Sequence, residues 1–454
     1  MSQPDLLTHL VENNEEPAWR DPQEGWLSYG ELARRVAQLA TTYPAPAGRH
    51  LVYLPFVTST LHLLHYLLAL RDGHAIMLAD PAQDAQLHRE QCQRFGVSLQ
   101  VLEDGAVAYL GDAPSLHPEL AMLLPTSGST GSSKWVRLSR TNLDANAAAI
   151  AEYLALNGGE RAITSLPLFY SFGMSVLNSH LLAGASLVSC TASPLERQFW
   201  DEVNRHQVTS VAGVPFTFQM LNRLRFDWAR YPSLMTMTQA GGRLEPALAR
   251  QFAEQAAALG RRFFVMYGQT EAAPRIAWLA HDEVMIAPDA IGRAVPGGRL
   301  SLRHESGFPD GEGELVYQGP NVMLGYAERT EELARGRDMD ALFTGDLARC
   351  DEAGRFYLTG RLNRFLKLFG KRVSLAEVEA WLQGRGYACA ATGRDDRLLV
   401  AIEADACPCD ALQLEVARWL MVPPSSVRIY QHYLPRRSNM KIDYPALLTE
   451  LEQL

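Results

Sequence analysis

Two hydrophobic patterns alternate along the chain from about residue 27 onward. Segments with apolar residues at helical spacing, such as LSYGELARRVAQLA at 27–40, are followed by short apolar runs, such as HLVYLPF at 50–56. Further runs of this kind follow at 74–81, 161–167, 185–191, 208–215 and 261–268. The segments between them are long enough for crossover helices, so the pattern predicts parallel sheets covered by helices, an α/β fold.

The pattern changes after residue 291. Short alternating segments separated by glycine and turn residues predict a β-rich, antiparallel subdomain at about 291–360. Helix-like and strand-like segments then alternate again, as in SLAEVEAWLQGRG and RLLVAIEA. We therefore expect a large N-terminal domain over 1–362 and a small α+β domain over 363–454, joined by a short polar hinge.

The composition is that of a folded protein. Apolar residues make up 47% of the 454 residues and charged residues 20%, values close to the globular average. The formal net charge of −9 argues against a nucleic-acid surface built from excess lysine and arginine. We therefore expect a small-molecule partner and no nucleic acid.

Three features indicate a cytoplasmic protein. The cysteines show no CxxC pair and no zinc-like spacing, and the N-terminal sequence lacks the basic and apolar regions of a signal peptide. The most apolar stretch, at 61–70, contains two histidines and is shorter than a membrane span. We expect this stretch to be a core helix and the chain to have no membrane span.

The stretch LLPTSGSTGSSKWVRLS at 123–139 is the first candidate for chemistry. It does not fit the G-x-x-x-x-G-K-[ST] pattern of a Walker A loop. Gly128 and Gly131 nevertheless allow backbone N–H groups to converge on an anion, and Lys134 adds a positive charge. The hydroxyl donors of the stretch are Ser127, Ser129 and Thr130. Together these residues suit a clamp for polyphosphate.

The segment TSGSTGSSK resembles the phosphate loop of the adenylate-forming (AMP-binding) superfamily, which includes acyl-CoA synthetases, aryl-acid ligases, luciferases and the adenylation domains of nonribosomal peptide synthetases. Other motifs resemble that family in order and spacing: LSYGEL at 27–32, LPLFYSFG at 166–173, YGQTE at 267–271, GELVYQGPNVMLGY at 313–326, FTGDL at 343–347, GRLNRFLKLFGKRVSLAEVE at 360–379 and PRRSNMKID at 435–443. The resemblance covers nearly the whole chain and is closest to a compact stand-alone acyl- or aryl-acid ligase. It implies that a carboxylate attacks the α-phosphorus of ATP, giving an acyl-adenylate and pyrophosphate, before a thiol takes the acyl group.

The resemblance implies two sets of nucleotide-binding residues. The loop residues that hold the leaving pyrophosphate, together with Lys134, are Thr126, Ser127, Gly128, Ser129, Thr130 and Gly131. In YGQTE, Tyr267 and Gly268 lie at the adenine and Thr270 at the α-phosphate, while Glu271 binds Mg²⁺ with Thr130 as a second ligand. Gly241 and Gly242 belong to the same nucleotide site. Thr270 and Glu271 are therefore candidate catalytic residues.

Residues near the predicted hinge complete the nucleotide site. Asp346 resembles the acid that accepts hydrogen bonds from the ribose hydroxyls, a role that suits a fixed carboxylate. Arg361 resembles the arginine that assists at the ribose and phosphates. Asn363 falls at the hinge itself, where the family more often has aspartate or lysine.

The C-terminal part resembles the family segment that carries the catalytic lysine. Lys441 matches the residue that bridges the carboxylate and the α-phosphate during adenylation. Its motif departs from the family pattern at Arg437, where threonine is usual, and at Met440, where glycine is usual. Lys367 and Gly370 lie in the segment that the resemblance implies in the thioester step.

The apolar segment at 166–173 is expected to line the acid pocket. The pocket residues are Tyr170, Phe172, Gly173 and Val214. Amino-acid-activating relatives have an aspartate at the position of Gly173, where it pairs with the substrate ammonium. A buried ammonium without such a partner would be unfavourable. An aryl or acyl carboxylic acid is therefore favoured over an amino acid.

The acceptor and two alternative functions stay open at this point. The thiol acceptor is either CoA or the phosphopantetheine of a discrete acyl carrier protein, because no appended carrier site is recognisable. One alternative is an amino-acid-activating ligase that loads a carrier protein. The other, suggested by the departures at Asn363, Arg437 and Met440, is a degenerate protein that binds nucleotide or carrier protein without turnover.

Overall fold

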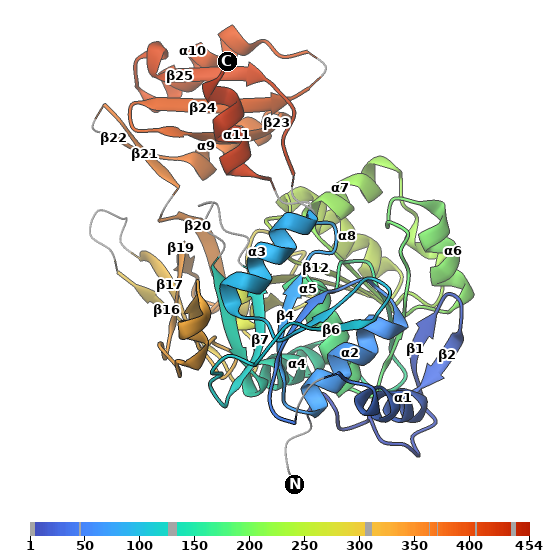
Figure 1. The fold of residues 1–454 in the computed structure, drawn as a ribbon. Helices are drawn as coiled ribbons and strands as arrows, with labels where there is room; N and C mark the ends of the chain where they lie inside the picture. Colours follow the sequence, from blue (N-terminus) through green and yellow to red (C-terminus); the bar gives the residue numbers. More distant parts are fainter. Residues whose placement is uncertain are drawn as a thin grey trace. The chain divides into compact units, whose positions relative to one another are not determined.

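The computed structural model describes residues 5–44, 47–125, 134–304, 311–362, 364–369, 371–404, 406–436 and 442–454 (Figure 1). Its elements form two compact units. The first lies within Met1–Thr126, Ser133–Leu300 and Tyr317–Leu342. The second includes Ser301–Val316 and Phe343–Leu454. The predicted boundary at residues 362 and 363 stays a prediction.

The first unit contains two large sheets, each with parallel strands at its centre and antiparallel strands at its edges. The nine-stranded sheet has the order β15 (Arg293–Ala294), β14 (Arg275–Leu279), β13 (Arg262–Gly268), β12 (Thr236–Gln239), β11 (Ser210–Gly213), β9 (Arg161–Ile163), β10 (Ser186–Val188), β1 (Pro17–Asp21), β2 (Gly25–Ser28). The seven-stranded sheet has the order β18 (Gly325–Ala327), β8 (Trp135–Ser139), β7 (Leu120–Pro125), β4 (Ala75–Ala79), β3 (Leu51–Pro55), β5 (Leu99–Val101), β6 (Val107–Tyr109). The predicted α/β class is confirmed.

Two helices form the layer between these sheets. Helix α4 (Arg140–Leu154) contacts β7 and β8, α5 (Ser171–Leu182) contacts β9 and β10, and the two helices pack against each other. Fully buried leucines from all three layers share one core, as Leu138 of β8, Leu177 of α5 and Leu187 of β10 show. The other helices of this unit are α1 (Tyr29–Thr41), α2 (Thr60–Arg71), α3 (Ala85–Phe95), α6 (Arg197–Arg205), α7 (Pro215–Arg223), α8 (Pro246–Ala258) and the short η1 (Trp228–Arg230), η2 (Thr270–Ala272) and η3 (Thr330–Ala334).

The apolar stretch at 61–70 forms most of α2, and its side chains are largely buried in the core. The sequence-based expectation of a core helix is therefore confirmed. Among the residues that the structure describes, no helix is both long and apolar enough to cross a membrane.

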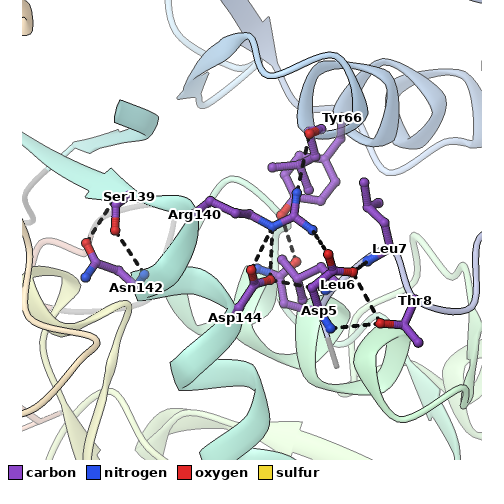
Figure 2. Close-up of polar contacts among 11 residues, drawn as sticks. Asp5, Leu6, Leu7, Thr8, Tyr66, Ser139, Arg140, Asn142 and Asp144 are labelled. Carbon is purple, nitrogen blue, oxygen red and sulfur yellow. Dashed lines mark hydrogen bonds and ion pairs between the residues drawn. The ribbon is translucent and has the colours of Figure 1, made fainter. Parts of the chain in front are cut away.

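Helix α4 begins where its sequence provides a reciprocal cap (Figure 2). The Ser139 hydroxyl accepts a hydrogen bond from the Asn142 backbone N–H at 3.1 Å, and the Asn142 side chain accepts one from the Ser139 N–H at 2.9 Å. Arg140 forms an ion pair with Asp144 at 3.0 Å, and Asp144 also accepts the Leu6 backbone N–H at 3.1 Å. The start of α4 is thus fixed directly after β8.

The remaining sheets lie wholly or for the most part in the second unit. One has the order β16 (Arg299–Arg303), β17 (Glu312–Gln318), β19 (Leu342–Cys350), β20 (Phe356–Arg361), and a hairpin follows with β21 (Phe365–Leu368) and β22 (Lys371–Ser374). The last sheet joins β23 (Ala388–Arg394), β24 (Arg397–Glu403) and β25 (Val427–Gln431). Helices α9 (Leu375–Gln383) and α11 (Tyr444–Glu452) contact β23, and α10 (Cys409–Leu420) contacts β25, as Figure 1 shows; η4 spans Pro424–Ser426.

Candidate active site

The YGQTE motif lies where β13 ends, at the carboxyl end of the parallel strands. Open α/β sheets bind their ligands at this end. The Gln269 N–H donates to the Pro274 carbonyl at 2.9 Å and closes the turn that follows the strand. Gly268 faces the same carbonyl, and a Cβ atom there would lie 1.9 Å from its oxygen. This close approach explains why glycine follows Tyr267 in the motif.

Two buried asparagines hold this turn in place. The side chain of Asn321 donates to the carbonyls of Ala272 at 2.6 Å and Arg275 at 2.8 Å, and accepts the Tyr317 hydroxyl at 2.7 Å. Asn146 on α4 donates to the Arg275 carbonyl at 3.1 Å. The motif is thus tied both to α4 and to the segment after β17.

Glu271 lies in a cluster with an aromatic ring and a lysine. The Tyr326 hydroxyl donates to Glu271 Oε1 at 2.9 Å, and the Glu271 carbonyl accepts the Met323 N–H at 2.9 Å. Lys134 Nζ lies 5.7 Å from the centroid of the Tyr326 ring and 3.6 Å from Glu328 Oε1. Tyr326 is therefore a shared neighbour of Lys134 and Glu271, both predicted site residues.

Tyr326 was not assigned a role from the sequence. It is the last residue of the quoted motif at 313–326, and its place at the end of a family-like motif is the signal that could have identified it. The side chain of Asn142 anchors the same segment, because it donates to the carbonyls of Pro320 at 2.7 Å and Val322 at 2.9 Å. The cap of α4 and the position of Tyr326 thus depend on one asparagine.

The N-terminus of α5 lies beside Thr270. Ser171, the first residue of α5, has its Oγ atom 3.3 Å from Thr270 Oγ1. Tyr170 occupies the N-cap position without a side-chain hydrogen bond to the helix. A helix N-terminus carries a partial positive charge, so this position favours a negatively charged group.

Three predicted pocket residues meet at Gly241. A Cβ atom on Gly241 would lie 2.8 Å from the Tyr170 hydroxyl, 3.2 Å from Val214 and 3.9 Å from Phe172. Gly241 also has a φ of +86°, which favours glycine. The adjacent Gly242 carbonyl accepts a hydrogen bond from the Gln239 side chain at 2.9 Å. The structure therefore brings Gly241 and Gly242, predicted for the nucleotide, next to the predicted acid pocket.

Gly173 serves the packing of α5. A Cβ atom at this position would lie 2.2 Å from the Pro167 carbonyl oxygen, so the helix accommodates only glycine there without a backbone shift.

A small cavity continues behind Phe172 into the interior of the first unit. Its volume is about 20 Å³, room for roughly one water molecule. The lining includes Phe172 and Ser175 of α5, Thr238 of β12, and Arg275 at the start of β14. Arg275 was not predicted as a site residue, because the sequence pattern alone does not reveal that this charged side chain is buried.

In the second unit, Asp346 and Arg361 are direct partners. They face each other across the antiparallel pair β19 and β20, and Arg361 Nε donates to Asp346 Oδ1 at 2.6 Å. Asp346 is buried, and its backbone N–H donates to the Thr344 hydroxyl at 3.1 Å. Lys367 lies on β21 with an exposed side chain, and its backbone N–H donates to Asp395 Oδ1 at 2.9 Å.

Several predicted residues lie outside the described part of the chain. They are Thr126, Ser127, Gly128, Ser129, Thr130, Gly131, Asn363, Gly370 and Lys441, together with the motif departures Arg437 and Met440. Their assigned roles stay predictions.

The described residues fit a magnesium ion that is held mainly by a nucleotide. Within the described ranges, no three His, Cys, Asp or Glu side chains converge to bind a metal ion by themselves. Mg²⁺ in phosphate-transfer sites is commonly held by one or two carboxylates together with the phosphates and water. The partly exposed carboxylate of Glu271, beside Thr270, is a hard oxygen ligand of this kind.

Comparison with known proteins identifies the family. The profile of the AMP-binding enzyme family matches residues 96–327, about half of the chain. Feruloyl-CoA synthase from Amycolatopsis sp is 30% identical and aligns over 82% of this chain and 81% of its own. Indoleacetate–CoA ligase from Aromatoleum aromaticum is 27% identical over 78% of this chain and 77% of its own.

Solved structures agree in fold. O-succinylbenzoate coenzyme A synthetase (MenE) from Bacillus subtilis, in complex with ATP and a magnesium ion, has a TM-score of 0.79 at 20% identity and covers 99% of each chain. At this identity the likeness shows the fold alone. Taken with the family profile and the relatives, the observations establish that the chain belongs to the AMP-binding enzyme family and is a ligase of the adenylate-forming superfamily, as its motifs predicted.

Proposed function

We propose that the protein uses ATP to activate an aryl carboxylic acid as an acyl-adenylate and then transfers the acyl group to the pantetheine thiol of CoA. The observation that carries the proposal is the contact between Ser171 and Thr270 at 3.3 Å, which joins the apolar pocket to the nucleotide motif. Because Ser171 stands between Tyr170 and Phe172, an acid in this pocket lies beside the residue predicted at the α-phosphate.

The site's main task is to bring two anions together. Lys134 beside Tyr326 and the positive end of α5 supply favourable charge from the described residues. In the first step, a carboxylate oxygen forms a bond to the α-phosphorus, and the bond to the bridging oxygen of pyrophosphate breaks. In the second step, the thiol sulfur attacks the acyl carbon, AMP leaves, and the thiol proton passes to solvent.

Each nucleotide contact has a proposed residue. Tyr267 packs against the adenine, Thr270 donates to the α-phosphate, and Glu271 holds Mg²⁺, with Tyr326 orienting its carboxylate. When bound, the metal ion neutralises phosphate charge. In the second unit, Asp346 accepts from the ribose hydroxyls and Arg361 orients it.

The remaining roles follow the family resemblance. The loop at 126–131 holds the pyrophosphate, Lys441 bridges the carboxylate and the α-phosphate, and Asn363 serves as the hinge of a small C-terminal domain. Lys367 and Gly370 act in thioester formation. ATP and Mg²⁺ are therefore required for the first step, and CoA for the second.

The pocket supports an aryl acid over an amino acid. The position that holds an aspartate in amino-acid-activating relatives is Gly173, where a side chain would meet the Pro167 carbonyl. The pocket walls near Gly241 are the aromatic rings of Tyr170 and Phe172 and the aliphatic Val214. Relatives named for feruloyl and indoleacetyl groups fit the same acid class.

The test is acid-dependent exchange of labelled pyrophosphate into ATP. Aryl, fatty and amino acids are compared at equal concentration, followed by thioester assays with CoA and with phosphopantetheinylated carrier proteins. We expect exchange with aryl acids and thioester formation with CoA. Exchange with amino acids alone would reverse the acid assignment, and thioester formation only on a carrier protein would reverse the acceptor. No exchange with any acid would support the degenerate, non-catalytic alternative.

A further inference from the structure

Arg275 is a buried cation in the interior of the first unit. Only 2% of its surface is exposed, and its Nε atom has no hydrogen-bond partner among the described residues. Within the same part of the chain, no Asp or Glu forms an ion pair with it. The Tyr153 hydroxyl forms a hydrogen bond with its guanidinium, and the Tyr170 hydroxyl interacts with it electrostatically. A buried guanidinium without a counter-charge is unfavourable.

The guanidinium lies against the predicted acid pocket. Its central carbon is 4.1 Å from the centroid of the Phe172 ring, and Arg275 and Phe172 both line the cavity described above. Phe172 also lies next to Gly241 in the acid pocket. Phe172 thus lies next to both the Arg275 guanidinium and the pocket at Gly241.

The cavity extends away from the nucleotide motif. The motif follows the carboxyl end of β13, whereas the cavity lining includes Ser210 and Thr236, the first residues of the neighbouring parallel strands. An acid whose carboxylate reacts near Thr270 therefore directs its opposite end toward this cavity. The lining there is partly polar, with Ser175 and Ser179 of α5 beside His180.

We propose that Arg275 determines specificity by binding an oxygen atom on the end of the acid that is remote from the reacting carboxylate. This inference rests on the proposed function and names its substrate class: aryl acids with a carboxylate or hydroxyl on the far side of the ring. The remote oxygen accepts hydrogen bonds from the guanidinium. Burial lowers the pKa of Arg275, which agrees with a site in which a cation lacks a fixed anionic partner.

The experiment measures kcat/KM for pyrophosphate exchange with three para-substituted benzoates of similar size. They carry a carboxylate, a hydroxyl or a methyl group opposite the reacting carboxylate. For the unmodified enzyme, at least one oxygen-bearing acid is expected to exceed 4-methylbenzoate by roughly tenfold or more, as for a hydrogen bond to a charged group. The better of the two oxygen acids identifies the remote group.

Three variants separate recognition from a structural role. Arg275→Met removes the donors and should abolish or invert the preference for the oxygen-bearing acid, while Arg275→Lys should retain part of it. Arg161→Met removes a control arginine that stacks on Trp26 at 4.8 Å and is absent from the cavity lining. This control should leave the preference unchanged. Urea unfolding of each variant shows whether it folds.

The outcomes are distinguishable. An unmodified enzyme that activates all three benzoates without preference overturns the inference and leaves the proposed function intact. An unchanged preference in a folded Arg275→Lys or Arg275→Met variant also overturns it, because the arginine would then be purely structural. No exchange with any acid removes both the inference and the proposed function.

Discussion

At the scale of single residues, Tyr326 connects two charges through one hydroxyl and one ring face. Its hydroxyl donates to Glu271 at 2.9 Å, and Lys134 Nζ lies 5.7 Å from its ring centroid. Family-like motifs indicated both Lys134 and Glu271 as site residues, but their shared neighbour could not be read from spacing alone. That contact depends on how β18 pairs with β8, which is a long-range feature of the fold.

Tyr326→Phe should slow acid-dependent pyrophosphate exchange roughly tenfold, because a hydrogen bond to a charged group contributes about 1.5 kcal/mol or more. The ring over Lys134 stays in place, so binding through that lysine should change little. Tyr109→Phe is the matched control, because Tyr109 donates to the exposed Asp112 at 3.2 Å. A Tyr326→Phe enzyme as fast as this control would show that the hydroxyl does not position Glu271.

Gly241→Ala should raise the KM for the acid several-fold more than the KM for ATP. The new methyl group would meet the Tyr170 hydroxyl at 2.8 Å and Val214 at 3.2 Å, inside the predicted pocket. Gly260→Ala is the control, because Gly260 also has a positive φ, +66°, with no atom within 4 Å of its Cβ position. Both substitutions cost about 1 kcal/mol of backbone strain. An equal change in acid KM for the two variants would contradict the pocket assignment.

At the scale of elements, side chains of α4 hold two backbone segments of the site in place. Its cap residue Asn142 holds the carbonyls of Pro320 and Val322, and Asn146, one turn later, holds the Arg275 carbonyl. The hydrophobic pattern predicted the alternating helices and strands around this region. It did not predict these contacts, because an asparagine on a helix gives no sign of which distant carbonyl it meets.

Asn142→Ala should lower the free energy of unfolding by roughly 3 kcal/mol, because it removes the side-chain half of the reciprocal cap and leaves two buried carbonyls without their donor. It should also slow pyrophosphate exchange, since the segment that carries Tyr326 loses its anchor. Asp84→Ala removes only the local cap of α3, where Asp84 accepts the Leu87 N–H at 2.9 Å, and should cost about 1 kcal/mol. Urea unfolding and exchange assays measure both effects. Normal exchange in a destabilised Asn142→Ala enzyme would refute the link to Tyr326.

At the scale of the whole molecule, the resemblance of the motifs indicated the adenylate-forming family before any fold was known, and the α/β class followed from hydrophobic periodicity. Neither the motifs nor the periodicity predicts that Arg275 is buried. Its neighbours in sequence form an ordinary strand start, and its buried state follows only from the packing of α5 against the nine-stranded sheet. Gly173 could be matched to a family position, but its contact with the Pro167 carbonyl required the three-dimensional structure.

Buried histidines in the first unit should make its stability depend on pH. Burial lowers the pKa of His65 to about 4, and His62, His74 and His180 shift in the same direction. The His65 ring donates from Nε2 to the Gly105 carbonyl at 2.9 Å, and its Nδ1 accepts the Tyr43 hydroxyl at 3.0 Å, so the neutral ring fits this site.

Below pH 6.5 the unfolded chain binds a proton at His65 that the folded chain does not bind until about pH 4. Stability is therefore expected to fall as the pH is lowered across this window, by roughly 3 kcal/mol for this residue. Urea unfolding at several pH values measures the slope. His65→Gln should flatten the profile, and an identical slope in the variant would contradict the assignment to His65.

The most direct test of the central claim follows an oxygen atom from the acid to the nucleotide. An aryl acid with both carboxylate oxygens labelled with oxygen-18 is incubated with ATP, Mg²⁺ and CoA, and the products are analysed by mass spectrometry. Attack of the carboxylate on the α-phosphorus predicts AMP that carries one labelled oxygen, with unlabelled pyrophosphate. Unlabelled AMP, or label in pyrophosphate or phosphate, would contradict formation of an acyl-adenylate.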